Sequence, residues 1–213
     1  MNAVKGYVLV VEDIPDILTF LDATLKLRNH RVVTARNGQE ALDAIDRECP
    51  SLVVTDILMP KLDGFGLIHR LRINPETRNI PVIFITATYI APEDREFALE
   101  IGVTRFVEKP VDIEKFLSVV EELLILGSHL RQEPLDEAKF YDGYRKRLEM
   151  KLNHKIAQIA RIEHLLVTPE EVESEGNQAA LRASLHQAIS DQDEIQHLIA
   201  QIDEHYKKDI HPE

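Results

Sequence analysis

The chain has 213 residues, of which 44% are hydrophobic, and a formal net charge of −12. This length allows one full domain and a smaller second one, and the negative charge argues against a nucleic acid or an anionic membrane as the partner. A single cysteine, Cys49, excludes an internal disulfide, and the absence of a signal-like N-terminus or an 18-residue apolar run predicts a cytoplasmic protein.

Short β-rich segments alternate with amphipathic helical segments as far as about residue 126. The expected strands are Tyr7–Val11, Arg31–Ala35, Leu52–Thr55, Val82–Thr86 and Arg105–Glu108. The expected helices are Ile14–Leu27, Gln39–Arg47, Gly66–Ile73, Glu93–Ile101 and Ile113–Leu126. This alternation predicts βαβ units that form a parallel sheet with helices on both faces. The continuously apolar strands VLVV and VIFI agree with burial on both faces.

Charged and polar residues stand where four of these strands end. Glu12 and Asp13 follow the first strand, Asp56 follows the third, Thr86 ends the fourth and Lys109 follows the fifth. Open α/β sheets bind ligands in the crevice outside the carboxyl ends of their strands, so the three carboxylates are expected to converge. A site of oxygen ligands without His or Cys suits Mg²⁺. The sequence therefore predicts a magnesium site at this edge of the sheet.

The same strand ends carry the motifs ED, DILMPKLDG, TA and KP, in this order. Each residue alone could be a solvated loop acid, a helix cap or an ordinary strand residue. As a set, over roughly residues 5–126, they resemble the receiver domain of two-component response regulators. The resemblance implies a flavodoxin-like five-stranded sheet in the order 2-1-3-4-5. Within the DILMPKLDG loop, Asp63 and Gly64 fit a tight turn.

The resemblance also implies a chemistry. Asp56 would accept a phosphoryl group from a histidine kinase or a phosphotransfer protein. Mg²⁺ would be held by four groups: Glu12, Asp13, Asp56 and the backbone carbonyl of Leu58. The Lys109 ammonium and the Thr86 hydroxyl would neutralise further phosphoryl oxygens. The expected protein is thus a phosphoacceptor and not an enzyme, since it would promote only its own phosphorylation and slow dephosphorylation.

Further positions of the resemblance concern switching and lifetime. Thr86 and Phe106 match the two switch positions, although the family often has Tyr where Phe106 stands, and Phe106 could equally be a core aromatic. A cis peptide bond is expected before Pro110, since X–Pro bonds are the common cis sites. Leu58 and Thr88 flank the site where some receivers position an attacking water. Because Leu58 is unable to do this and Thr88 is poorly suited, a long-lived phosphorylated state is expected.

After residue 127 the pattern changes to long helical periodicity. A linker is expected at 128–137, followed by an αα-hairpin at 138–213 whose helices join near 168–177. The first helix has an apolar stripe at Tyr141, Tyr144, Leu148, Leu152, Ile156, Ile159 and Leu166. The second has a heptad seam at Leu181, Leu185, Ala188, Gln192, Ile195, Ile199, Ile202 and Tyr206. Each helix of about 30 residues would be about 45 Å long.

Residues 128–213 hold 11 Lys and Arg against 17 Asp and Glu, which argues against a DNA-reading output module. Helices packed only as one hairpin are marginal in water, so we expect a homodimer that forms a four-helix bundle. Our main hypothesis is a response regulator whose receiver, residues 1–127, controls a helical module for dimerisation or partner binding. The output partner is unknown at this point.

Two alternatives remain open. The segment HLLVTP, which starts at His164, resembles the histidine box of sensor kinases, and a phosphorelay intermediate could carry a second phosphorylation site there. However, Leu165 stands where the box has an acid, and residues 168–171 also form an ordinary helix start. The second alternative is an adaptor whose receiver is never phosphorylated.

Overall fold

The computed structural model describes residues 6–86, 92–126, 133, 135–167 and 175–205. The chain divides into two compact units, Met1–Asp136 and Glu137–Glu213, and each is described by itself. The helix start expected at 168–171 and most of the linker expected at 128–137 lie outside the described residues.

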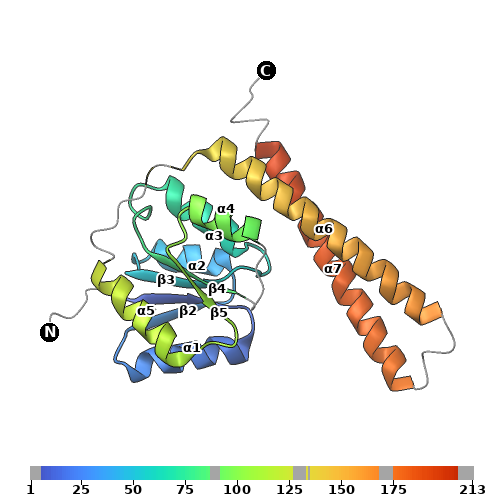
Figure 1. Ribbon diagram of the computed structural model, residues 1–213, viewed down its shortest axis with the longest axis horizontal. Coiled ribbons are helices and arrows are strands. Elements are labelled where there is room, and N and C mark those ends of the chain that lie inside the picture. Colours follow the sequence, from blue (N-terminus) through green and yellow to red (C-terminus); the bar gives the residue numbers. More distant parts are fainter. Residues whose placement is uncertain (1–5, 87–91, 127–132, 134, 168–174, 206–213) are drawn as a thin grey trace. The chain divides into compact units, whose positions relative to one another are not determined.

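Strands and helices alternate in the described part of the first unit (Figure 1). The strands are β1 (Val8–Val11), β2 (Val32–Ala35), β3 (Leu52–Asp56), β4 (Val82–Thr86) and β5 (Arg105–Glu108). The helices are α1 (Pro15–Leu27), α2 (Gly38–Ile45), α3 (Gly64–Ile73), α4 (Pro92–Glu100) and α5 (Ile113–Leu126).

The five strands form one parallel sheet in the order β2-β1-β3-β4-β5, which confirms the predicted flavodoxin-like topology. Helices α1 and α5 cover one face, and α2, α3 and α4 cover the other (Figure 1). The apolar side chains of the central strands are buried, whereas the edge strands β2 and β5 keep exposed residues. This is the pattern that a parallel sheet covered on both faces requires.

Helix α3 starts two residues earlier than the sequence analysis predicted. The Asp63 carboxylate accepts a hydrogen bond from the backbone N–H of Gly66 at 2.9 Å, so Asp63 is the N-cap and Gly64 is the first helical residue. The interpretation of Asp63 and Gly64 as a tight turn was therefore wrong. An acidic N-cap satisfies an N–H group that has no partner inside the helix, which explains why the helix extends back to this point.

A buried arginine links three segments at the end of the sheet where β4 and β5 begin. The Arg72 side chain, on α3, is only 2% exposed. Its guanidinium donates to the carbonyl oxygens of Arg78, Ile80 and Gly102 at 2.8, 3.0 and 2.6 Å. Burial lowers the pKa of Arg72 to about 10, so the guanidinium stays charged at neutral pH. It links α3 to the chain that enters β4 and to the chain that precedes β5.

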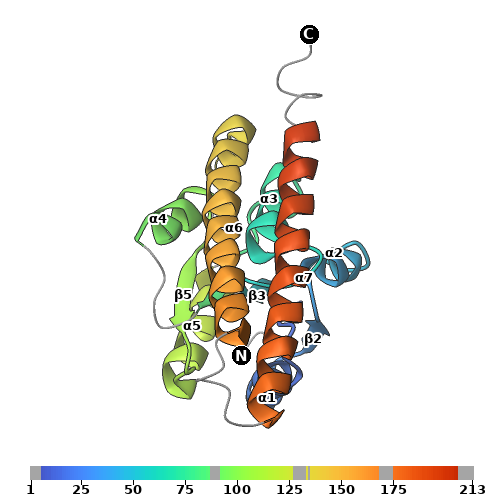
Figure 2. The ribbon, with the colours of Figure 1, turned by 90° about the vertical axis from the view of Figure 1, so that its right-hand side faces the viewer.

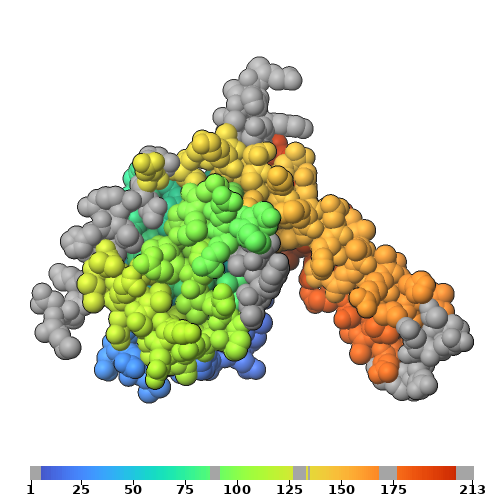
Figure 3. All heavy atoms as spheres, viewed as in Figure 1, coloured from blue at the N-terminus to red at the C-terminus, as the bar shows by residue number. Residues whose placement is uncertain are grey.

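The second unit is a hairpin of two long helices, α6 (Glu137–Val167) and α7 (Glu175–His205), which lie side by side (Figures 1 and 2). The helices are antiparallel, because Arg145, early in α6, pairs with Asp203, late in α7, at 3.0 Å. Lys155 pairs with Asp191 at 2.8 Å nearer the middle. The space-filling view shows the atoms of α6 lying directly against those of α7 (Figure 3).

The apolar stripe predicted for α6 was wrong at one turn. Ile156 is 46% exposed, whereas Ile162, which the stripe omitted, is buried. The face that packs on α7 runs through Lys155, Ile159 and Ile162, at spacings of four and three residues. Lys155 takes the position assigned to Ile156 because its ammonium pairs with Asp191. Among the described residues, no helix has the length and apolar character needed to cross a membrane.

Candidate functional site

Three carboxylates meet at the carboxyl ends of β1 and β3. Glu12 and Asp13 directly follow β1, and Asp56 is the last residue of β3. The parallel register pairs Val11 with Thr55, so the two strands end side by side. One carboxylate oxygen from each of the three acids lies within 4.8 Å of the others. The convergence that the strand ends predicted is therefore present.

Lys109 joins this cluster from β5. Its Nζ lies 2.7 Å from Oδ2 of Asp56 and 2.9 Å from Oε2 of Glu12, so one ammonium bridges two of the acids. The backbone N–H of Lys109 donates to the carbonyl oxygen of Thr86 at 2.7 Å, which holds the ends of β4 and β5 together. The peptide bond between Lys109 and Pro110 is cis, as the sequence analysis expected.

Burial and ion pairing shift the pKa values of Glu12 and Lys109 in opposite directions. Glu12 is fully buried, and burial raises the pKa of its carboxyl more than the hydrogen bond from Lys109 lowers it. Burial lowers the pKa of Lys109, but its hydrogen bonds to Asp56 and Glu12 outweigh that effect and the pKa is raised. Lys109 is therefore a cation at neutral pH and offsets one carboxylate. When all three acids are ionised, two negative charges remain, which a divalent cation would balance.

The composition of the cluster fits Mg²⁺. Its side chains offer carboxylate oxygens, which hard divalent cations prefer, and include no imidazole or thiolate that would favour zinc or copper. Mg²⁺ is usually bound through few protein oxygens with several waters kept. The partly exposed Asp13 and Asp56 leave room for such a hydrated ion.

The loop after Asp56 is folded tightly against the end of β3. The Asp56 Oδ1 atom accepts a hydrogen bond from the N–H of Ile57 at 2.6 Å, and the N–H of Gly64 donates to the carbonyl of Ile57 at 2.9 Å. A Cβ atom on Gly64 would lie 2.5 Å from the carbonyl oxygen of Asp56. Position 64 therefore requires glycine, because any side chain would push this loop off the acidic cluster.

The other predicted site residues occupy different positions around the cluster. Thr86 is buried at the end of β4, next to β3, where Asp56 pairs with Ile85. Leu58, two residues after Asp56, has a side chain that is 59% exposed. Thr88 lies outside the described residues.

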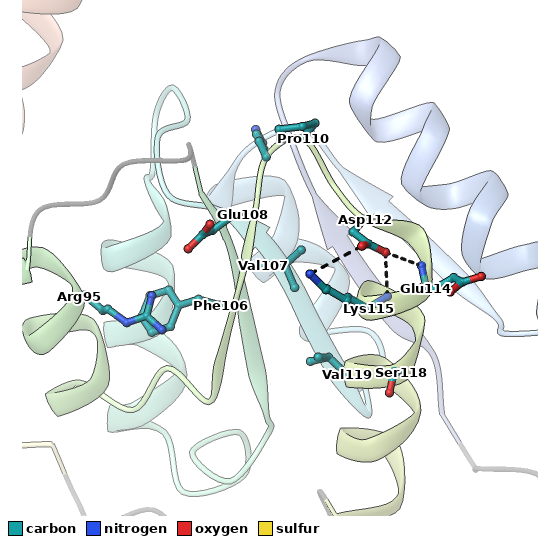
Figure 4. A pocket seen from close by; sticks show the side chains of 11 residues that line it. Arg95, Phe106, Val107, Glu108, Pro110, Asp112, Glu114, Lys115, Ser118 and Val119 are labelled. Carbon is teal, nitrogen blue, oxygen red and sulfur yellow. Dashed lines mark hydrogen bonds and ion pairs between the residues drawn. The ribbon is translucent and has the colours of Figure 1, made fainter.

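Phe106 is half-buried on β5 and contacts a core aromatic and a cation. Its ring centroid lies 6.2 Å from that of Phe84, edge to face, and 4.5 Å from the Arg95 guanidinium. Figure 4 shows Arg95 of α4 stacked on the Phe106 ring. A cation–π contact at an exposed site contributes roughly 0.5–1 kcal/mol. The sequence analysis did not find Arg95, because 11 positions separate it from Phe106 and no local pattern links them.

A hollow of about 720 Å³ opens beside this pair, between α4, β5 and α5 (Figure 4). Its lining includes Arg95, Phe106, Lys109 and Lys115. Because Lys109 also pairs with Asp56, the hollow and the acidic cluster have one residue in common.

Comparison with known proteins agrees with this geometry. The model of the response regulator receiver domain family matches residues 8–121. An uncharacterized 14.6 kDa protein of Leptolyngbya boryana is 40% identical over 115 residues, which cover 54% of this chain and 87% of that protein. The probable transcriptional regulator ycf27 of Porphyra purpurea is 38% identical over 124 residues, or 58% of this chain. The chain spans 49% of the length of that regulator.

Solved structures give the same result. The signal receiver domain of a signal transduction histidine kinase from Syntrophus aciditrophicus matches with a TM-score of 0.54 and 33% identity. That match covers 62% of this chain and 98% of the solved one. The chemotaxis response regulator CheY4 of Vibrio cholerae matches with a TM-score of 0.52 and 26% identity, over 55% of this chain and 98% of that one.

Proposed function

The chain belongs to the response regulator receiver family of two-component signalling, and on this premise we propose that Asp56 accepts a phosphoryl group from a histidine kinase or a phosphotransfer protein. One observation carries the proposal. The Asp56 carboxylate lies within reach of two further carboxylates and 2.7 Å from the ammonium of Lys109. Such a group is a nucleophile placed between a cation and a site for a second cation.

The residues at the strand ends would have different roles in phosphoryl transfer. Receiver domains bind Mg²⁺ at an acidic pocket, and here Glu12, Asp13, Asp56 and the Leu58 carbonyl would hold it. The bound ion would neutralise charge on the phosphoryl oxygens. A carboxylate oxygen of Asp56 attacks phosphorus while the bond from phosphorus to the donor's imidazole nitrogen breaks. Lys109 then exchanges a carboxylate partner for a phosphoryl oxygen, and the Thr86 hydroxyl donates to another.

Labelling with a small phosphodonor tests this assignment. In the presence of Mg²⁺ the wild type should be labelled and Asp56→Asn should not, because an amide is not a nucleophile for phosphorus. The matched control is Asp63→Asn, the same substitution in the same loop, where the amide oxygen still accepts from Gly66. The assignment fails if Asp56→Asn is labelled like the wild type, or if Asp63→Asn loses the label while the chain stays folded.

The exposed apolar side chain at position 58 should make the phosphorylated state long-lived. Leu58 has no group that could orient a water molecule towards phosphorus, and a longer-lived acyl phosphate follows. Leu58→Asn should therefore shorten the half-life several-fold, whereas the isosteric apolar change Leu58→Met should leave it unchanged. The decay of labelled protein after removal of the donor measures both. Equal half-lives for Leu58→Asn and the wild type would contradict this role for position 58.

We further propose that the hairpin is the output module and that it acts by self-association without binding DNA. In the single hairpin, Ala188 and Ile202 of the predicted seam are buried, while Leu181, Leu185, Ile195 and Ile199 are only half-buried. A second hairpin would remove that surface from water. The full chain should sediment as a dimer whether or not Asp56 is phosphorylated, and a monomer at working concentrations would contradict the proposal.

The phosphorelay alternative, with His164 as a second phosphorylation site, has one supporting observation. The His164 side chain is exposed in the last turn of α6, where a donor could reach it. Stability in alkali separates the two sites, because phosphohistidine survives alkali and an acyl phosphate does not. A label that persists in alkali and disappears in His164→Gln would favour the relay.

The adaptor alternative is rejected if Asp56 is labelled at all.

A further inference from the structure

Two isoleucines remain exposed near the middle of the hairpin. Ile156 on α6 is 46% exposed and Ile189 on α7 is 39% exposed. Both stand next to half-buried leucines, Leu152 and Leu185, which are one turn away on the same helices. We call these four side chains the Ile156–Ile189 face.

The two helices present these side chains on the same side of the hairpin. Ile156 follows Arg145 by 11 residues, close to three full turns, and Ile189 precedes Asp203 by 14, close to four. Arg145 and Asp203 form an ion pair at 3.0 Å. Ile156 and Ile189 therefore both lie on the side of the hairpin that carries this ion pair. The pair of Lys155 and Asp191 then puts Ile156 and Ile189 at nearly the same level along the hairpin.

We propose that the Ile156–Ile189 face is the surface through which two copies of this chain associate. The inference rests on the proposed self-association of the hairpin and adds which side of it is used. The contact between α6 and α7 within one copy covers only part of the predicted seam, and the half-buried Leu185 of that seam also belongs to the Ile156–Ile189 face. The neighbouring Ile156–Ile189 face would serve the contact between copies.

The charges around the face are of both signs, which favours a second copy over a polyanion. The four side chains of the Ile156–Ile189 face are apolar, and the exposed Asp193 stands one turn after Ile189 on α7. The two ends of the face each carry both signs, with Arg145, Glu149 and Asp203 at one end and Glu163 and Arg182 at the other. Two copies related by a two-fold axis can pair such ends with opposite charges in either direction. The acids around the face outnumber Arg145 and Arg182, which argues against a polyanion as the partner.

Sedimentation of full-length variants tests the face. The double variant Ile156→Glu, Ile189→Glu should sediment as a monomer of 24.4 kDa, while the wild type sediments as a dimer. Met150→Glu is the matched control: Met150 is 49% exposed, but it lies six residues from Ile156 and so about 120° around α6. It should remain dimeric, with the helical circular dichroism of all three proteins unchanged.

Cross-linking keeps the test decisive if the double variant unfolds. In a Cys49→Ser background, a mixture of Ile156→Cys chains and Ile189→Cys chains should give covalent dimers with a short thiol cross-linker, and Met150→Cys chains should not. The face is overturned if the glutamate variant dimerises like the wild type, or if Met150→Cys cross-links equally well. A monomeric wild type would refute the self-association itself. Labelling of Asp56 in the same samples reports on the phosphoacceptor independently.

Discussion

An Asp13→Asn variant should phosphorylate Asp56 at least 100-fold more slowly than the wild type at a fixed, limiting Mg²⁺ concentration. Loss of a group that only orients a metal ligand typically costs about 10–100-fold in affinity, and loss of a ligand should cost more. The charge balance gives the physical reason. With Lys109 paired to Glu12 and Asp56, Asp13 supplies much of the uncompensated negative charge that attracts a divalent cation.

The rate measured against Mg²⁺ concentration distinguishes this effect from a general defect. Asp13→Asn should shift the curve to higher Mg²⁺ with the maximal rate partly recovered. Asp16→Asn, an exposed acid in the first turn of α1, should follow the wild-type curve. A wild-type curve for Asp13→Asn, or full activity of the wild type in excess chelator, would remove Mg²⁺ from the account.

Arg72→Ala should destabilise the receiver unit by about 3 kcal/mol or more. It leaves three carbonyl oxygens without their donor in a buried site, and each buried group left unsatisfied costs roughly 1–3 kcal/mol. Arg70→Ala, an exposed change two residues away on α3, should stay within about 0.5 kcal/mol of the wild type. Hydrogen exchange of β4 and β5 peptides in a urea series reports this unit separately from the hairpin. Equal midpoints for the two variants would contradict the role given to Arg72.

The sequence was sufficient for the sheet and for the convergence of the acids. The parallel sheet and its strand ends follow from the βαβ pattern, and the strand order from the resemblance to receiver domains. Each acid stands directly at a strand end, so the sheet brings Glu12, Asp13 and Asp56 together. The position of Lys109 followed from the same rule. The pattern did not predict that the Lys109 ammonium contacts both Glu12 and Asp56, because this depends on side-chain geometry.

Long-range and mixed-polarity contacts explain what the sequence analysis missed. The sequence suggests that Arg72 is a surface arginine on a helix. Its three acceptors are backbone carbonyls, which every residue has, so no side-chain pattern indicates them. The error at Ile156 has a related cause. A hydrophobicity count excludes Lys155 from a packing face, although a lysine can cover apolar surface with its stem while its ammonium reaches an acid.

Localising the phosphoryl group in the wild-type chain tests the central claim most directly. An aspartyl phosphate is reduced by borohydride to homoserine, whereas other phosphorylated side chains are not, and peptide mass spectrometry then identifies the position. After incubation with Mg²⁺ and a phosphodonor, we predict homoserine at position 56 in the peptide that contains VVTDILM. Homoserine at another position, or a labelled protein with none, would contradict Asp56 as the phosphoacceptor.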